Sequence, residues 1–152
     1  MKKISITFRI ILGCFFYILS INLHAENSLS PIGLWRTYDL DNNPRSIVRF
    51  YLVGNTLQGN IVKILSTNQQ KSSDICTNCP SPWKNKSKLG MTIIWGLKKQ
   101  GDQWVGGTVL DTDGGNTYSC QITLSPDNKV MYFKAYVAVP LLGKTIEWTR
   151  VK

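Results

Sequence analysis

After residue 25, apolar and polar residues alternate one by one in several segments of this chain. In residues 117–124, every second position is apolar or aromatic: Tyr118, Cys120, Ile122 and Leu124. The same period of two appears in residues 48–52 and 131–137. Because successive side chains of a strand point to opposite faces, each segment predicts a half-buried β-strand. No later segment shows a sustained helical period.

Eight segments have this strand character. We expect strands at residues 34–38, 48–52, 57–65, 91–97, 103–110, 117–124, 131–137 and 144–151. Most connections are short and rich in Gly, Pro, Asn and Asp, as tight turns require. Closure of such a meander removes its exposed edges, so the predicted fold is all-β, an eight-stranded up-and-down antiparallel barrel. A β-sandwich is the alternative.

The first and last strands carry a pair of residues suited to closing the barrel. Arg150 shares the apolar face of the last strand with Ile146 and Trp148. A buried guanidinium needs hydrogen bonds or an aromatic face to offset its lost hydration. Gly33, Trp35 and Arg150 are therefore predicted to form a structural plug at the base. In the alternative, the strand end frays and Arg150 extends into water.

These terminal motifs resemble those of the calycins, the group that contains lipocalins and fatty-acid-binding proteins. A longer succession of motifs resembles a bacterial exported family catalogued as domain of unknown function 2147. Its motifs run in order as Ile32-Gly33-Leu34-Trp35-Arg36-Thr37, Gly59-Asn60-Ile61-Val62, Trp95-Gly96-Leu97, Trp104-Val105-Gly106-Gly107, Thr117-Tyr118-Ser119-Cys120, Leu141-Leu142-Gly143-Lys144-Thr145 and Trp148-Thr149-Arg150. The resemblance implies a calycin-like barrel and an envelope location, and it carries no activity. One departure is Thr112, where the pattern has proline after Asp111, and it is expected to alter only a turn.

The N-terminus has the composition of an export signal. A basic start precedes an apolar run at residues 10–23 and a small residue, Ala25. We expect a cleaved signal peptide at residues 1–25 and one domain at 26–152, periplasmic or secreted, with no transmembrane segment in the mature chain. A rival prediction places a lipoprotein processing site at Cys14.

Removal of this segment changes both charge and chemistry. The chain has 18 basic and nine acidic residues, and loss of Lys2, Lys3 and Arg9 lowers the formal charge from +9 to +6. A basic exported domain suits anionic envelope components, whereas nucleic acid is not expected there; a merely solubilising charge is the alternative. The only histidine, His24, also leaves. Histidine-dependent catalysis and metal binding are thereby excluded, so we expect no enzyme, cofactor or metal site.

If the plug marks the base, the first, third, fifth and seventh connections lie at the open mouth. The longest, at about residues 66–90, contains Cys76 and Cys79. In an oxidising compartment we expect a disulfide between them, with Cys120 as a buried thiol. The alternatives are a bridge from Cys120 to the loop, a redox-active pair, and a zinc site that lacks a fourth ligand.

Aromatic residues suggest what the barrel holds. Phe50, Trp95, Tyr118 and Phe133 are predicted to surround a small ligand beneath Trp83 of the long loop. The predicted function is that of an exported envelope protein binding a small hydrophobic or anionic amphipathic ligand.

The alternative function is an envelope interaction module with a filled barrel. In that hypothesis Lys84, Lys86 and Lys88 form a basic surface on the mouth loop, although such a cluster is more often a solvated loop. Ligand, partner and oligomeric state stay open at this level.

Overall fold

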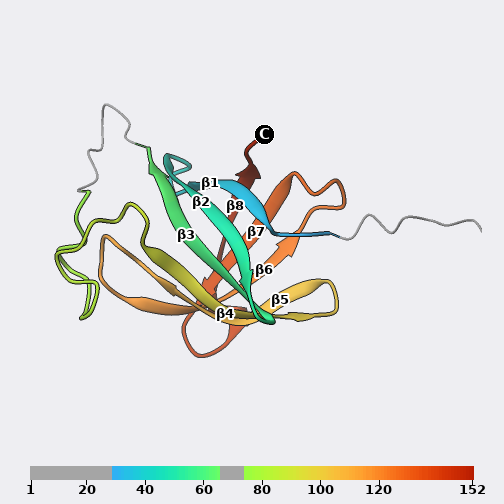
Figure 1. Cartoon of the computed structure of the whole chain (residues 1–152). Coiled ribbons are helices and arrows are strands. Elements are labelled where there is room, and N and C mark those ends of the chain that lie inside the picture. Colours follow the sequence, from blue (N-terminus) through green and yellow to red (C-terminus); the bar gives the residue numbers. More distant parts are fainter. Residues whose placement is uncertain (1–28, 66–73) are drawn as a thin grey trace, which may run out of the picture.

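A computed structural model describes residues 29–65 and 74–152, so the predicted signal peptide lies outside the described residues. The chain forms a closed antiparallel barrel in which each strand pairs with its sequence neighbour and β1 pairs with β8 (Figure 1). The strands are β1 Gly33–Tyr38, β2 Pro44–Val53, β3 Thr56–Ile64, β4 Thr92–Gln100, β5 Gln103–Leu110, β6 Thr117–Leu124, β7 Val130–Tyr136 and β8 Lys144–Arg150. The predicted up-and-down barrel is confirmed, and the sandwich alternative is wrong. Among the described residues, no helix is long and apolar enough to cross a membrane.

Strand limits depart from the sequence prediction where the alternation is interrupted. β2 begins at Pro44, earlier than predicted, because a register shift between Ile47 and Val48 breaks its period. β7 ends at Tyr136, and a short 3-10 helix, η1 (Pro140–Leu142), lies in the connection that follows. A local irregularity interrupts the ladder without opening it, so the barrel still closes.

Trp35 and Arg150 meet at the base. The Arg150 Cζ lies 4.2 Å from the centroid of the Trp35 ring, and Trp35 is fully buried. Arg150 donates hydrogen bonds to backbone oxygens of Asn128 (2.7 Å), Ile32 (3.0 Å) and Ser30 (2.5 Å), and to Asn128 Oδ1 (2.8 Å). Burial lowers the pKa of Arg150, and these acceptors compensate the guanidinium for its lost water. Arg150 therefore ties β8 to the segment before β1 and to the turn between β6 and β7.

The core fills the interior toward this base. The Trp148 ring stacks on Phe133 with centroids 4.2 Å apart and lies 6.2 Å from Phe50. Leu97 and Cys120 are fully buried in the same cluster. These side chains therefore fill the interior on the side of the base.

The two ends of the barrel differ in their connections. At the base, β2 and β3, β4 and β5, and β6 and β7 are joined by tight turns. The opposite end carries the connections that follow β1, β3, β5 and β7, and the longest, the one after β3, is among them (Figure 1). This arrangement places four connections around one opening.

Candidate functional site

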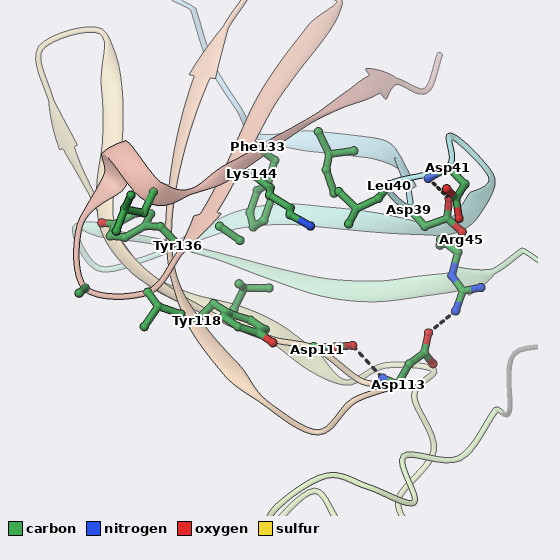
Figure 2. A pocket seen from close by; sticks show the side chains of 16 residues that line it. Asp39, Leu40, Asp41, Arg45, Asp111, Asp113, Tyr118, Phe133, Tyr136 and Lys144 are labelled. Carbon is green, nitrogen blue, oxygen red and sulfur yellow. Dashed lines mark hydrogen bonds and ion pairs between the residues drawn. The ribbon is translucent and has the colours of Figure 1, made fainter.

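A cavity of about 890 Å³ lies at the mouth of the barrel. The connections after β1, β5 and β7 and the adjoining strand ends supply its lining (Figure 2). The lining residues are Asp39, Leu40, Asp41, Arg45, Val109, Asp111, Asp113, Tyr118, Phe133, Ala135, Tyr136, Val137, Ala138, Leu142, Lys144 and Ile146. Its size falls within the range typical of small-molecule sites.

The inner wall of the cavity is apolar. Val109, Tyr118, Ala135 and Ile146 come from the inward faces of four consecutive strands, β5 to β8. Phe133 lies deepest, since it lines the cavity and stacks on Trp148 below. The alternation along each strand therefore produces one continuous apolar surface above a packed aromatic floor.

The rim is charged. Figure 2 shows Asp39, Asp41, Arg45 and Asp113 on one side of the opening, away from Tyr136. The Asp39 Oδ1 accepts hydrogen bonds from the backbone nitrogens of Asp41 (3.0 Å) and Asn43 (2.9 Å). Desolvation opposes ionisation of Asp39, but the hydrogen bonds from Asn43 and Asp41 and the Arg45 charge outweigh it and lower the pKa. The Asp39 carboxylate thus holds the first connection in its turn.

Asp113 joins three segments of the mouth. It forms ion pairs with Arg45 of β2 and with Lys88 of the third connection, whose Nζ lies 2.5 Å from Asp113 Oδ1. The Lys88 side chain is only 4% exposed. The predicted surface of three lysines is therefore wrong in one member: Lys84 and Lys86 are exposed, but Lys88 is buried because it reaches Asp113.

The Asp113 carboxylate makes docking of the third connection depend on pH. Desolvation raises its pKa, but Lys88 and Arg45 outweigh that effect and lower it. Ionised Asp113 therefore stabilises the fold above the pKa of an unfolded aspartate, about 3.9. This contribution is lost as the pH falls through the lower pKa of the folded state.

We expect the stability difference between the natural chain and Asp113→Asn to shrink as the pH falls below about 4. Urea unfolding at pH values from about 6 down to 2.5 measures it. Asp102→Asn, which removes an exposed carboxylate from the turn between β4 and β5, is the control. A difference that stays constant across this range would contradict the role of the Asp113 charge.

The described part of the third connection, residues 74–90, lies beside the cavity and lines none of it. A disulfide joins Cys76 and Cys79, with Cα atoms 5.4 Å apart. Cys76 Sγ lies 3.4 Å from the backbone oxygen of Thr112, and Asn78 Nδ2 donates a hydrogen bond to the backbone oxygen of Asp113 at 2.8 Å. These contacts fasten the loop to the fifth connection, so these residues do not form the predicted cover.

The aromatic residues proposed from the sequence separate into two groups. Tyr118 and Phe133 line the cavity, whereas Phe50 packs near Trp148 toward the base. Trp95 and Trp83 stack on each other outside the cavity, with ring centroids 5.5 Å apart.

The different position of Trp95 has a local cause. Gly96 has a φ of +78°, and the β3 register with β4 is irregular here. Ile94 and Leu97 are consequently the fully buried residues of β4, and Trp95 falls on the outer face. Trp83 and Trp95 therefore lie outside the cavity described above, and their predicted role as ligand contacts finds no support there.

Most of the residues that line the cavity were not predicted from the sequence. Asp39, Arg45, Tyr136, Leu142 and Lys144 were not among the predicted ligand contacts, although they line the cavity. They lie at the mouth because they belong to, or adjoin, the first, fifth and seventh connections, which alternation of strand direction places at that end. The sequence could therefore have indicated them if all the mouth connections had been considered, rather than the longest one alone.

The thiols offer no exposed nucleophile among the described residues. Cys76 and Cys79 are paired, and Cys120 is fully buried. Burial raises the pKa of the Cys120 thiol to about 12, so it stays protonated at neutral pH. The alternative bridge from Cys120 to the loop is absent. In residues 29–65 and 74–152, no group of three or more His, Cys, Asp or Glu side chains is arranged to hold a metal ion.

The closed eight-stranded meander defines a lipocalin-like barrel of the calycin type. Residues 33–150 match the model of the family described as "Uncharacterized protein conserved in bacteria (DUF2147)", and the chain belongs to this family. Both resemblances drawn from the sequence motifs are thus confirmed.

A solved structure is similar in fold: "Protein HP1028 from the human pathogen Helicobacter pylori belongs to the lipocalin family". The two are 19% identical, with a TM-score of 0.69 over 82% of this chain and 84% of that one. No curated protein matches. At this identity the likeness establishes the barrel alone.

Proposed function

We propose that this protein is exported and binds a small apolar or amphipathic ligand, without catalysis, in the cavity at the mouth of its barrel. The observation that carries the proposal is the cavity of about 890 Å³, which has an apolar inner wall and a charged rim. A cavity of this kind suits a ligand whose apolar part lies inside and whose polar end lies at the opening.

The walls favour this orientation of the ligand. Val109, Phe133, Ala135 and Ile146 offer only apolar side-chain atoms, so an apolar group gains by leaving water among them. Lys144 brings an ammonium group to the lining, and the carboxylates of the rim accept hydrogen bonds. Both signs of charge are therefore available to a polar end group.

The chemistry of the chain supports binding without catalysis, and its N-terminus supports export. The buried Cys120 and the paired Cys76 and Cys79 are poor nucleophiles. The single histidine, His24, precedes the predicted cleavage point. The proposal of export is based on the composition of residues 1–25, which is typical of a signal peptide. An exported protein would reside in the periplasm or outside the cell.

The alternative of an interaction module with a filled barrel has less support. Its interior would be packed throughout, whereas aromatic packing fills only the part near Trp148. Its basic loop would present three lysines, whereas Lys88 is buried against Asp113. Both observations favour a ligand site over this alternative.

A substitution that fills the cavity tests the proposal. Ala135→Trp places an indole in the space above Phe133, and Ser119→Trp adds the same group to the exposed outer face of β6 as a control. The uncharged probe 1-N-phenylnaphthylamine and the anionic probe 11-(dansylamino)undecanoic acid measure binding by fluorescence titration.

We expect saturable binding of at least one probe by the natural chain, weakened by roughly tenfold or more in Ala135→Trp. Ser119→Trp should bind within about twofold of the natural chain, because its indole lies outside the barrel. Circular dichroism confirms that each variant is folded. Absence of saturable binding by the natural chain, or equal binding by Ala135→Trp, would contradict the proposal.

A further inference from the structure

The connection between β7 and β8 exposes a continuous apolar segment. We call residues 137–142, Val-Ala-Val-Pro-Leu-Leu, the apolar lip. Leu141 is 89% exposed, Leu142 76%, Val137 66% and Val139 48%. A single exposed leucine is ordinary in a protein surface. Six consecutive apolar residues at the surface are not, and such a patch marks a place of interaction.

The fold holds the apolar lip away from the barrel. Backbone hydrogen bonds join Leu142 N to the Val139 oxygen (3.2 Å) and Gly143 N to the Pro140 oxygen (3.0 Å) within the turn formed by η1. Ala138 has a φ of +64°, a left-handed conformation that alanine disfavours. The projection of the leucines is therefore built by a defined turn, in a backbone conformation that alanine adopts only when the surrounding structure imposes it.

Gly143 lets this turn sit close against β7. A Cβ at Gly143 would lie 2.8 Å from both the Ala135 oxygen and the Tyr136 Cβ. Only glycine fits this approach without displacement of the backbone. The base of the apolar lip is thus seated on the strand, while Leu141 and Leu142 remain largely exposed.

The apolar lip is also an edge of the cavity. Val137, Ala138 and Leu142 belong to the cavity lining. Figure 2 shows the labelled carboxylates of Asp39 and Asp113 on the side of the opening away from Tyr136, the residue that precedes the lip. A surface that binds the apolar lip therefore lies next to the cavity opening, and these carboxylates lie on the other side of that opening.

Charges beside the apolar lip are basic. Between Asp127 and Glu147 the chain has no acidic residue. Lys134 and Lys144 lie near the ends of the two strands that the lip joins, where Ala135 pairs with Lys144. Exposed leucines flanked by lysines are typical of elements that enter the interface of a membrane with anionic lipids.

The shape of the apolar lip favours a lipid surface over a protein partner. Leu141 stands out from the barrel with almost no neighbours covering it, as its 89% exposure shows. A protein partner would need a concave pocket matched to this projection, whereas a fluid bilayer receives a projecting apolar turn without one. The flanking lysines complement anionic head groups.

We propose that the apolar lip inserts into the surface of a membrane containing anionic lipids. Lys134 and Lys144 then lie at the level of the head groups, and the cavity opens beside the bilayer. The carboxylates of Asp39 and Asp41 remain in water on the other side of the opening. This inference goes beyond the proposed ligand binding, since membrane attachment requires no ligand in the cavity.

Vesicle flotation with two matched variants tests the proposal. Leu141→Ser with Leu142→Ser removes the two leucines of the apolar lip. Leu52→Ser with Val53→Ser removes two apolar residues from the end of β2 at the base, where they are 47% and 48% exposed. The probes are vesicles of phosphatidylcholine alone and vesicles with about 30% phosphatidylglycerol. Circular dichroism confirms that each variant is folded.

We expect the natural chain to float with the anionic vesicles, and the lip variant to bind them at least about tenfold more weakly. The base variant should bind within about twofold of the natural chain. Lys134→Gln with Lys144→Gln should weaken binding to the anionic vesicles specifically and reduce its dependence on salt.

Three results would overturn the membrane proposal. They are no flotation of the natural chain, equal flotation of the lip variant, and equal loss in the base variant. A dimer of the natural chain that the lip substitutions dissociate would instead assign the lip to a second copy. Ala135→Trp should float like the natural chain, so failure of ligand binding and failure of membrane attachment are distinguishable.

Discussion

Replacing Trp35 with alanine is expected to lower the free energy of unfolding by about 3 to 5 kcal/mol. Trp35 is fully buried, and its Nε1 donates a hydrogen bond to the Pro31 oxygen at 2.7 Å. Its removal leaves a cavity at the base and takes away the surface beneath the Arg150 guanidinium, 4.2 Å from the ring centroid. Urea unfolding followed by circular dichroism measures the effect.

Arg150→Ala is expected to lower the stability by a smaller amount, about 1 to 3 kcal/mol, because Arg150 is partly accessible and donates to backbone oxygens on both sides of the seam. The double variant should lose less than the sum of the two single losses, with a coupling of roughly 0.5 kcal/mol or more. Arg36→Ala, which removes an exposed arginine from β1, is the control for lost charge. Additive effects of Trp35→Ala and Arg150→Ala would show that the two do not act as one plug.

Gly107→Ala is expected to destabilise the barrel by about 1 to 3 kcal/mol through overpacking. A Cβ at this position would lie 2.4 Å from Leu97 Cγ, 2.7 Å from Leu97 Cδ2 and 3.1 Å from Cys120 Sγ. Leu97 and Cys120 are fully buried, so neither has free space into which it can retreat. Thermal and urea unfolding measure the loss.

A compensating substitution makes this prediction sharper. Leu97→Ala alone should cost about 2 to 5 kcal/mol, because it opens a cavity in the core. In the Gly107→Ala background it also removes the clash, so the double variant should be less destabilised than the sum of the single variants. Thr108→Ala, at the next position of β5, is the control. Full additivity would mean that the interior between β4 and β6 is loose rather than packed.

These variants also bear on the cavity. The interior is tightly packed at Leu97, Gly107 and Cys120, whereas the cavity at the mouth is lined by Ala135 and Ile146. Overpacking at Gly107 should therefore change stability far more than the affinity for a probe in the cavity. Substitution of Ala135 should instead change the affinity for the probe far more than the stability. Variants at Gly107 and Ala135 therefore distinguish effects on the stability of the barrel from effects on ligand binding.

The architecture was largely predictable from local patterns. In β6, Tyr118, Cys120 and Ile122 alternate with polar residues, and the structure pairs them with neighbouring strands in that phase. A period of two is a property of neighbouring residues, so it can be recognised without knowledge of the rest of the fold. The same holds for the tight turns at the base, where Gly54 and Gly101 have positive φ.

The site was predictable only in part. Tyr118 and Phe133 lie in regular strands and line the cavity, but Trp95 precedes Gly96, where the phase of β4 changes and carries the indole outside. The burial of Lys88 depends on Asp113, twenty-five positions away. No local pattern contains a contact of that kind.

By itself, the sequence determined the number of strands, their order and the end at which the long connections gather, because alternation and turn composition act between neighbouring residues. Only the tertiary structure decided which end of the interior is filled, which connections border the cavity and where the apolar lip stands. Those features depend on which side chains, from strands far apart in the chain, face one another across the barrel. Closure of the whole sheet sets the register between the strands, and it thereby brings Trp35 beside Arg150 and leaves space above Phe133.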